Sequence, residues 1–225
     1  MSVFHIPKSL QSRKHTGYRY KRYQSFKRVL QHEFSRVCVY CRQPDSVAPA
    51  LLYAFGVDHY RPKALRRFAS LEKDYDNLFY CCNPCNSRKN DYWPIDEKAG
   101  PFVLNPCNHD MASHLRFDST TAKFQAKSAS GQFTIDLLQL NDHDDEVQYR
   151  LQVLTILDVA GSKLKACEKR RDAAAVKMKA AGVSQNVADQ LRVLHGKLCA
   201  EIEKLEKVIA AHSGTLPLRP LPKKL

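Results

Sequence analysis

Two pairs of cysteines, each separated by two residues, place the tightest limit on how this chain can fold. The pairs are Cys38–Cys41 and Cys82–Cys85. A CxxC turn aims two thiolates at one point, and two such turns supply the four tetrahedral ligands that structural zinc prefers at about 2.3 Å. We therefore expect a closed Zn²⁺ site that holds the fold and performs no chemistry. Cys81 adjoins Cys82, but only Cys82 completes the two-residue gap to Cys85.

The length of the chain and its lack of long apolar segments favour metal binding by the cysteines over disulfide bonds. The chain has 225 residues, enough to bury a core, and its eight cysteines would suggest disulfides only in a small secreted domain. No apolar run approaches the length of about 18 residues that a membrane span requires, and the first residues lack the apolar core of a secretory signal. We expect a cytoplasmic protein with reduced thiols and no membrane contact.

The charge is strongly positive and unevenly placed. The formal net charge is +13, and residues 1–95 hold 17 Lys and Arg against 7 Asp and Glu. Such a balance indicates an anionic partner, with nucleic acid ahead of a membrane surface. Residues 1–36 form either a partly disordered tail entering a helix, with Phe26, Leu30 and Phe34 on one face, or a basic arm that tracks a phosphate backbone with aromatic residues for stacking. Both interpretations can hold together.

Polar residues suited to catalysis lie between and beside the two cysteine pairs. Asp58 and His59 follow an apolar run and should end a strand, because the proline of the following YRPK turns the chain away. Asn77 lies in the sequence YDNL, and Asn86 directly follows the last cysteine of the pair. Residues 86–90 are expected to open a helix, with Asn or Ser as its cap.

This arrangement resembles the HNH endonucleases, the ββα-metal nucleases, in their H-N-N form. The resemblance covers roughly residues 36–92 and is carried by Asp58-His59, Asn77 and Asn86. It implies an endonuclease that hydrolyses phosphodiester bonds of DNA, and it implies that Asn77 orients the general base and its loop. The later stretches FVLNPC, HLRF and SGQFTIDLLQLN resemble the HNH nucleases of retron and Septu anti-phage systems. That resemblance implies a defence role beside an ATPase partner, bound through the C-terminal helices.

The chemistry of phosphodiester cleavage fits these residues. His59 can take a proton from water at neutral pH and is the expected general base. Asp58 and Asn86 offer hard oxygen ligands to Mg²⁺ or Mn²⁺. Four cations flank the site as phosphate contacts or, alternatively, as solvated surface charge: Arg61, Lys63, Arg88 and Lys89.

The predicted fold class is α+β: a zinc-stapled ββα-metal nuclease core, a small antiparallel β subdomain and a C-terminal helical hairpin. Short apolar runs at 102–104, 115–117, 122–127 and 132–135 predict the sheet, with Ser130-Gly131 as one hairpin turn and a short helix from Thr134. Helical spacing after 144 and a Ser184 cap predict two antiparallel helices, packed on the chain itself or presented to a partner. The expected domains are 1–36, 37–95, 96–143, 144–212 and a flexible tail at 213–225.

Two alternatives and one minor cluster stay open. A zinc-stabilised nucleic-acid-binding module that does not cleave would share the zinc site and the charge. An adaptor that scaffolds other proteins would use the C-terminal helices but leaves the Asp-His, Asn and Cys-Asn arrangement unexplained. Cys107, His109 and His114 lie close in sequence and form either a second metal site or ordinary packing.

Overall fold

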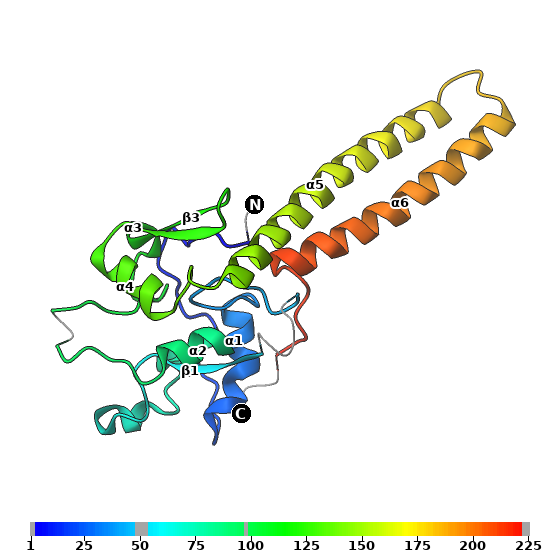
Figure 1. Cartoon of the computed structure of the whole chain (residues 1–225). Coiled ribbons are helices and arrows are strands. Elements are labelled where there is room, and N and C mark those ends of the chain that lie inside the picture. The colour runs from blue at the N-terminus through cyan, green and yellow to red at the C-terminus, as the bar shows by residue number, and fades with distance from the viewer. Residues whose placement is uncertain (1–2, 48–53, 97–98, 222–225) are drawn as a thin grey trace.

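The structure is a computed structural model of the whole chain, and it describes residues 3–47, 54–96 and 99–221. Residues 51–53 of the apolar run that precedes Asp58, and the extreme ends of the arm and tail, lie outside the described residues. The fold is mixed α and β, with two separate two-stranded antiparallel sheets. A long helical hairpin projects from a body that holds both sheets (Figure 1). Within the described residues, no helix is long and apolar enough to cross a membrane.

The predicted ββα core is present. Strand β1 (Phe55–His59) pairs antiparallel with β2 (Leu78–Cys82), and β2 leads directly into helix α2 (Asn83–Lys89). The predicted start of α2 was wrong. Residues 86–90 were expected to open the helix, but it begins at Asn83 and ends at Lys89. Pro84 explains the early start, since proline suits the first turn of a helix, where its missing N–H costs nothing.

The N-terminal region packs on this core. A 3₁₀ turn, Tyr23–Phe26, runs into helix α1 (Lys27–Glu33). Phe26, Leu30 and Phe34 are all buried, and Phe34 packs against Phe79 of β2 with ring centres 5.5 Å apart and the rings tilted. The predicted apolar face of this helix is therefore confirmed. Between β1 and β2 the chain makes two further 3₁₀ turns, Arg66–Leu71 and Tyr75–Asn77.

The middle region holds one hairpin where the sequence predicted a larger sheet. Its elements are α3 (Met111–His114), β3 (Leu115–Asp118), β4 (Lys123–Ala126) and α4 (Ala129–Leu137). The predicted strands at 102–104 and 132–135 and the turn at Ser130-Gly131 are wrong. Ser128 caps α4 by accepting from the Gly131 amide at 3.1 Å. A Cβ at Gly131 would lie 2.1 Å from the His114 carbonyl oxygen, so this glycine serves close packing and not a turn.

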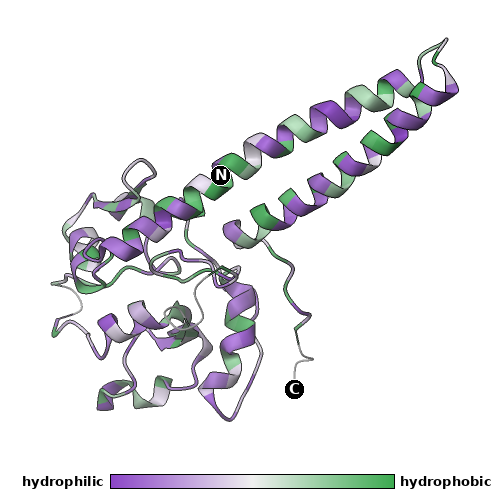
Figure 2. Cartoon of the chain, turned by 45° about the vertical axis from the view of Figure 1, so that its right-hand side comes forward, coloured by the Kyte–Doolittle hydropathy of each residue, from purple (hydrophilic) through white to green (hydrophobic). Residues whose placement is uncertain are grey.

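The C-terminal hairpin is confirmed. Helix α5 (Asp144–Met178) and helix α6 (Gln185–Ser213) lie antiparallel, and Ser184 caps α6 as predicted. Hydrophobic and hydrophilic bands alternate along both helices (Figure 2). Their shared core contains buried residues of both helices: Ala160, Cys167, Leu198, Ile202 and Leu205. The apolar stripe therefore packs mainly on the chain itself.

The hairpin base is tied to the body by polar contacts. The buried Arg150 donates to the carbonyl oxygens of Ala122 at 2.8 Å and Leu140 at 2.7 Å. The Tyr149 hydroxyl donates to the Val47 carbonyl at 2.7 Å. These bonds join α5 to the segments that precede it, so the near end of the hairpin is fixed while its far end extends into solvent.

Candidate active site and metal centre

The four cysteines of the two CxxC pairs meet at one point. Cys38 and Cys41 come from the loop after α1, Cys82 ends β2, and Cys85 lies in the first turn of α2. Their sulfur atoms lie within 4.8 Å of one another, and all four side chains are buried. Tetrahedral zinc with bonds of about 2.3 Å separates its sulfurs by about 3.8 Å. The Cys41–Cys82 distance of 3.6 Å fits that shell, so these cysteines can hold a zinc ion.

Cys81 lies outside this group although it is buried beside it. Its sulfur lies 3.9 Å from that of Cys38 and contacts the Cys82 carbonyl oxygen at 3.2 Å. The Cys82 thiol has a pKa lowered to about 6: its contact with Cys38 raises this pKa, and hydrogen bonds from Cys41, Cys81 and Cys85 outweigh that effect. Cys82 therefore carries thiolate character at neutral pH, which metal binding needs.

A pocket of about 290 Å³ joins the end of β1 to the face of α2. Asp58, His59 and Asn86 all line it, so three residues expected at the catalytic site lie together. Tyr23, Lys63 and Asp91 line it as well, in a set completed by Val57, Pro62, Ser87 and Asn90. The pairing of His59 with Leu78 places the histidine at the last rung of the sheet, next to the loop that follows.

The ring of His59 is held in one orientation. Its Nε2 lies 3.0 Å from the Glu72 carbonyl oxygen. Because a carbonyl only accepts, Nε2 carries the hydrogen, and Nδ1 keeps a lone pair. Burial lowers the pKa of His59 below its ordinary 6.5, while the Glu72 hydrogen bond and the charge of Asp58 oppose this effect. The imidazole is therefore neutral at pH 7 and able to accept a proton.

Asp58 is buried and held at both carboxylate oxygens. Its Oδ2 accepts from the Tyr40 hydroxyl at 2.6 Å, and its Oδ1 accepts from the Lys89 ammonium at 3.1 Å. Lys89 also donates to the His59 carbonyl at 2.8 Å. Burial, followed by the charge of Asp58, raises the pKa of Tyr40 well above its ordinary value, so this hydroxyl remains a donor. Each oxygen of Asp58 keeps lone-pair capacity, and with Asn86 on the same pocket the pair can serve as hard cation ligands.

Asn77 lies beneath the loop that follows His59. Its side-chain oxygen accepts from the Arg61 amide at 2.8 Å, and its side-chain nitrogen donates to the Arg61 carbonyl at 3.0 Å. The same nitrogen donates to the Leu71 carbonyl at 3.3 Å. The amide side chain therefore closes the loop that carries Glu72, whose carbonyl orients the His59 ring.

The four expected phosphate contacts lie in different surroundings. Lys63 is exposed at the rim of the pocket, and the guanidinium carbon of Arg61 lies 5.4 Å from the centre of the Trp93 ring. Arg88 turns away and pairs with Glu146 of α5 at 2.5 Å. Lys89 is only 1 % exposed and is enclosed with Asp58, which leaves it no surface for a phosphate. For Arg88 and Lys89 the structure thus differs from the expectation, because both cations neutralise carboxylates inside the protein.

The second cysteine-histidine group does not converge. His109 accepts from the Asn105 amide at 3.2 Å and stacks on Phe102, while His114 lies 2.6 Å from the Ser128 hydroxyl. Burial, with the charge of His114, lowers the pKa of His109 to about 4. Among the described residues, Cys38, Cys41, Cys82 and Cys85 are the one group of three or more His, Cys, Asp or Glu side chains close enough together to hold a metal.

Three residues of the site were missed from the sequence. Tyr40 lies inside the first CxxC turn, and nothing in that pattern distinguishes it from a spacer residue between the two cysteines. Asp91 follows α2 and lines the pocket, and its closeness in sequence to Asn86, five residues earlier, could have indicated this. Tyr23 comes from the N-terminal arm, and nothing in its local sequence places it beside His59.

Known proteins resemble this chain over the region that contains the four cysteines and the pocket residues Asp58, His59 and Asn86. Residues 38–92 match the family model described as HNH endonuclease, so the chain carries an HNH endonuclease domain there. The chain is also similar to the Septu protein PtuB of Bacillus mycoides (strain KBAB4), at 28% identity over 143 residues. That match covers 52% of this chain and 47% of the relative, so the chain spans about half the length of the relative it matches. No solved structure matches the chain.

Proposed function

We propose that this protein is a metal-dependent endonuclease that hydrolyses phosphodiester bonds of DNA. The observation that carries the proposal is the meeting of Asp58, His59 and Asn86 on one pocket, with the imidazole Nδ1 of His59 left with a free lone pair. The HNH endonuclease match over residues 38–92 supports the same chemistry. DNA is the proposed polymer because the resemblance to HNH endonucleases implies it.

Each residue has one task in the proposed reaction. His59 accepts a proton from the attacking water at Nδ1, and the Glu72 carbonyl keeps the ring aimed during transfer. Asp58 and Asn86 would hold Mg²⁺ or Mn²⁺, and the cation would stabilise the negative charge that develops on the phosphate and the leaving oxygen. Lys63 at the rim attracts the scissile phosphate. Tyr40 and Lys89 keep Asp58 in place, and they act through it without touching substrate.

Incubation of the purified protein with plasmid DNA tests the proposal. Nicking is expected with Mg²⁺ or Mn²⁺ and not without a divalent cation. His59→Ala should keep the fold and bound zinc but slow nicking by about 10²- to 10⁴-fold, the usual contribution of a general base. His143→Ala, an exposed histidine at the start of α5, is the matched control and should nick normally. Undiminished nicking by the His59 variant would remove His59 from its proposed role.

The same assay separates cleavage from binding alone. A zinc-stabilised binding module would retard DNA on a gel and leave it intact with every cation. Parallel incubation with RNA decides the polymer, because phosphate contacts do not distinguish the two. Cleavage of RNA with intact plasmid would replace DNA as the substrate and leave the catalytic assignment standing.

We also propose a role in anti-phage defence beside an ATPase partner. The similarity to a protein named for the Septu system supports it. The hairpin exposes valines that suit an interface: Val159, Val176, Val187 and Val193. Co-expression with candidate ATPases followed by size-exclusion chromatography tests the partner. Val176→Lys combined with Val187→Lys should break the complex, and a complex unchanged by both substitutions would rule out this surface.

A further inference from the structure

The N-terminal arm is fixed against the nuclease core at residues 11–15. The carboxylate of Glu33, a residue only 5 % exposed, accepts from the backbone amides of Lys14 and His15 at 3.0 Å and from the Tyr75 hydroxyl at 2.5 Å. Arg13 donates to the Leu78 carbonyl at 2.9 Å and lies 4.4 Å from the centre of the Phe79 ring. Since Phe26 at the other end is buried, the stretch between them is held at both ends.

This anchoring brings Tyr23 to the catalytic histidine. The ring centres of Tyr23 and His59 lie 4.6 Å apart in an edge-to-face contact. The Lys63 ammonium lies 4.3 Å from the centre of the Tyr23 ring. Tyr23 and Lys63 therefore form a partition that touches the catalytic pocket on one side.

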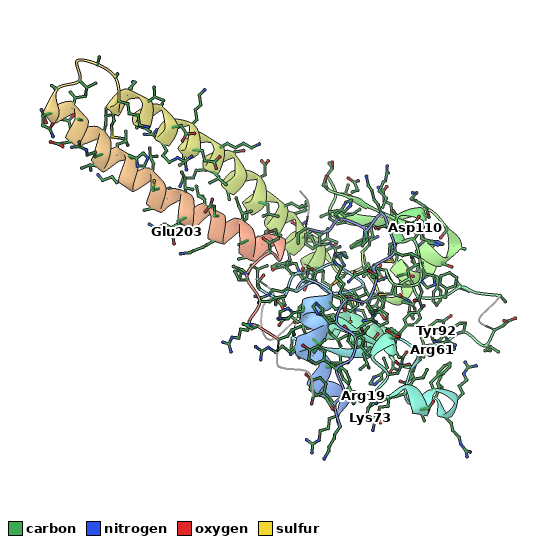
Figure 3. The ribbon with its side chains drawn as sticks, turned by 180° about the vertical axis from the view of Figure 1, so that it is seen from behind. Arg19, Arg61, Lys73, Tyr92, Asp110 and Glu203 are labelled. Carbon is green, nitrogen blue, oxygen red and sulfur yellow. The ribbon has the colours of Figure 1, made fainter. Side chains whose placement is uncertain are left out.

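A larger groove lies on the other side of that partition. It has a volume of about 720 Å³ and shares Tyr23 and Lys63 with the catalytic pocket. Its remaining lining comes from the arm and from the loop before β2: Lys21, Arg22, Gln24, Ser25, Glu72 and Lys73. Figure 3 places Lys73 and Arg61 on the nuclease body, away from the hairpin that carries Glu203. The groove and the catalytic pocket thus lie side by side, with Tyr23 and Lys63 between them.

The groove is cationic. Lys21, Arg22, Lys63 and Lys73 are exposed in it, against the single carboxylate of Glu72. Glu72 lies 3.7 Å from Lys63, and no ion pair within the described ranges neutralises Lys21, Arg22 or Lys73. A groove that combines cations with an aromatic ring is typical of sites for unpaired nucleic acid, because only an unpaired base can stack on the ring.

We propose that this groove binds an unpaired strand of the substrate next to the scissile phosphate. Tyr23 stacks on the base beside the cleavage position, while Lys21, Arg22 and Lys73 contact the following phosphates. The inference rests on the proposed nuclease function and specifies its substrate as single-stranded or locally opened DNA. The arm thereby selects the substrate, and the HNH domain cleaves it.

Binding measured without cleavage tests the groove. Fluorescence anisotropy, in buffer with no added divalent cation, compares one labelled oligonucleotide as a single strand and as a duplex. The wild-type protein should prefer the single strand. Tyr23→Leu, which keeps apolar packing, should weaken single-strand binding by about 5- to 150-fold, the range for loss of one stacked base, and Tyr23→Phe should restore it. Duplex binding should change little.

The cations are tested through salt dependence. Replacing Lys21, Arg22 and Lys73 by alanine should lower the slope of log affinity against log salt by about 0.7 for each lost phosphate contact on a single strand. The control replaces three exposed hairpin lysines, Lys165, Lys169 and Lys204, and removes equal charge. An equal loss of slope in the control would overturn the proposal. So would equal weakening of single strand and duplex by Tyr23→Leu, or no preference in the wild-type protein.

Plasmid nicking with Mg²⁺ is run in parallel, so that the two proposals fail separately. A protein that binds single strands through Tyr23 but never cleaves refutes the nuclease function and supports the groove. A protein that cleaves with full dependence on His59, while Tyr23→Leu binds like wild type, refutes the groove and supports the nuclease.

Discussion

At the scale of single residues, the buried pair of Lys89 and Asp58 organises the site. Lys89 is 1 % exposed and donates to both the Asp58 carboxylate and the His59 carbonyl. A buried cation or carboxylate without its counter-ion costs free energy, so removing one member of the pair leaves the other charge buried and uncompensated. The residue expected to bind phosphate instead sets the position of two catalytic candidates.

Lys89→Met should therefore destabilise the fold. It leaves the Asp58 charge buried with only the Tyr40 hydroxyl as partner, and the expected loss is about 3–5 kcal/mol in chemical denaturation. Lys207→Met, which breaks an exposed pair with Glu203, should leave the stability close to that of the wild-type protein, because solvent screens exposed ion pairs. Similar losses for the two variants would contradict the structural role of Lys89.

The arm contact of Glu33 predicts a dependence on pH. Burial alone would raise the pKa of Glu33, but hydrogen bonds from the Tyr75 hydroxyl and the amides of Lys14 and His15 outweigh burial and lower it below 4.5. A carboxyl group whose pKa is lower in the folded than in the unfolded state stabilises the protein at pH values above its unfolded-state pKa. That stabilisation is lost as the pH falls through the folded-state pKa.

Glu33→Gln should thus lower the melting temperature at pH 7, and its difference from wild type should shrink below pH 4.5. Glu206→Gln, an exposed change on α6, serves as control and should behave like wild type at both pH values. A difference that grows on acidification would have the wrong sign for this contact.

At the scale of elements, the four cysteines that can hold zinc join a loop, a strand and a helix. Cys82 ends β2, Cys85 lies in the first turn of α2, and Asn86 follows directly. Removing zinc should disorder the start of α2, so nicking should fall even with Mg²⁺ in excess. Full activity of a verified zinc-free protein would contradict this coupling.

Zinc content and hydrogen exchange measure the effect. Cys82→Ser should lose zinc and speed amide exchange in β2 and α2, because a hydroxyl is a poor replacement for a thiolate ligand. Cys199→Ser, an exposed cysteine on α6, should keep both zinc and protection. Retained stoichiometric zinc in the Cys82 variant would point to Cys81 as a replacement ligand.

The sequence predicted those parts of the fold that rest on local patterns. The CxxC spacing, the strand ending at His59 and the Ser184 cap are set by neighbours along the chain. The turn predicted at Ser130-Gly131 was wrong because the sequence does not distinguish a glycine needed for close packing from a glycine needed for a turn. The position of Tyr23 could not be predicted, because it depends on long-range contacts of Arg13 and Glu33.

At the scale of the whole molecule, we expect the hairpin of α5 and α6 to unfold as a unit separate from the body. Its two helices share a small core along their middle, whereas its base is bonded to the body through Arg150 and through Arg88 with Glu146. Elements with few buried apolar contacts open locally at lower free energy than the rest of a protein.

Ile202→Ala should open the hairpin and leave the nuclease core intact. The lost burial is expected to cost about 2–5 kcal/mol within the hairpin, visible as faster amide exchange in α5 and α6 with unchanged exchange in β1 and β2. Val208→Ala removes a side chain that is 38 % exposed and should have a small effect. Faster exchange throughout the body would show that hairpin and core unfold together.

The N-terminal arm has a consequence for how the catalytic unit is delimited. A protein trimmed to residues 38–92 would keep every cysteine of the metal centre and every residue of the matched motif. It would lose the ring contacts of Phe34 with Phe79 and of Tyr23 with His59. The residues that the motif matches are therefore fewer than the residues that the site needs. A truncated protein should begin upstream of Gln11, because the Gln11 side chain donates to the Glu33 carbonyl.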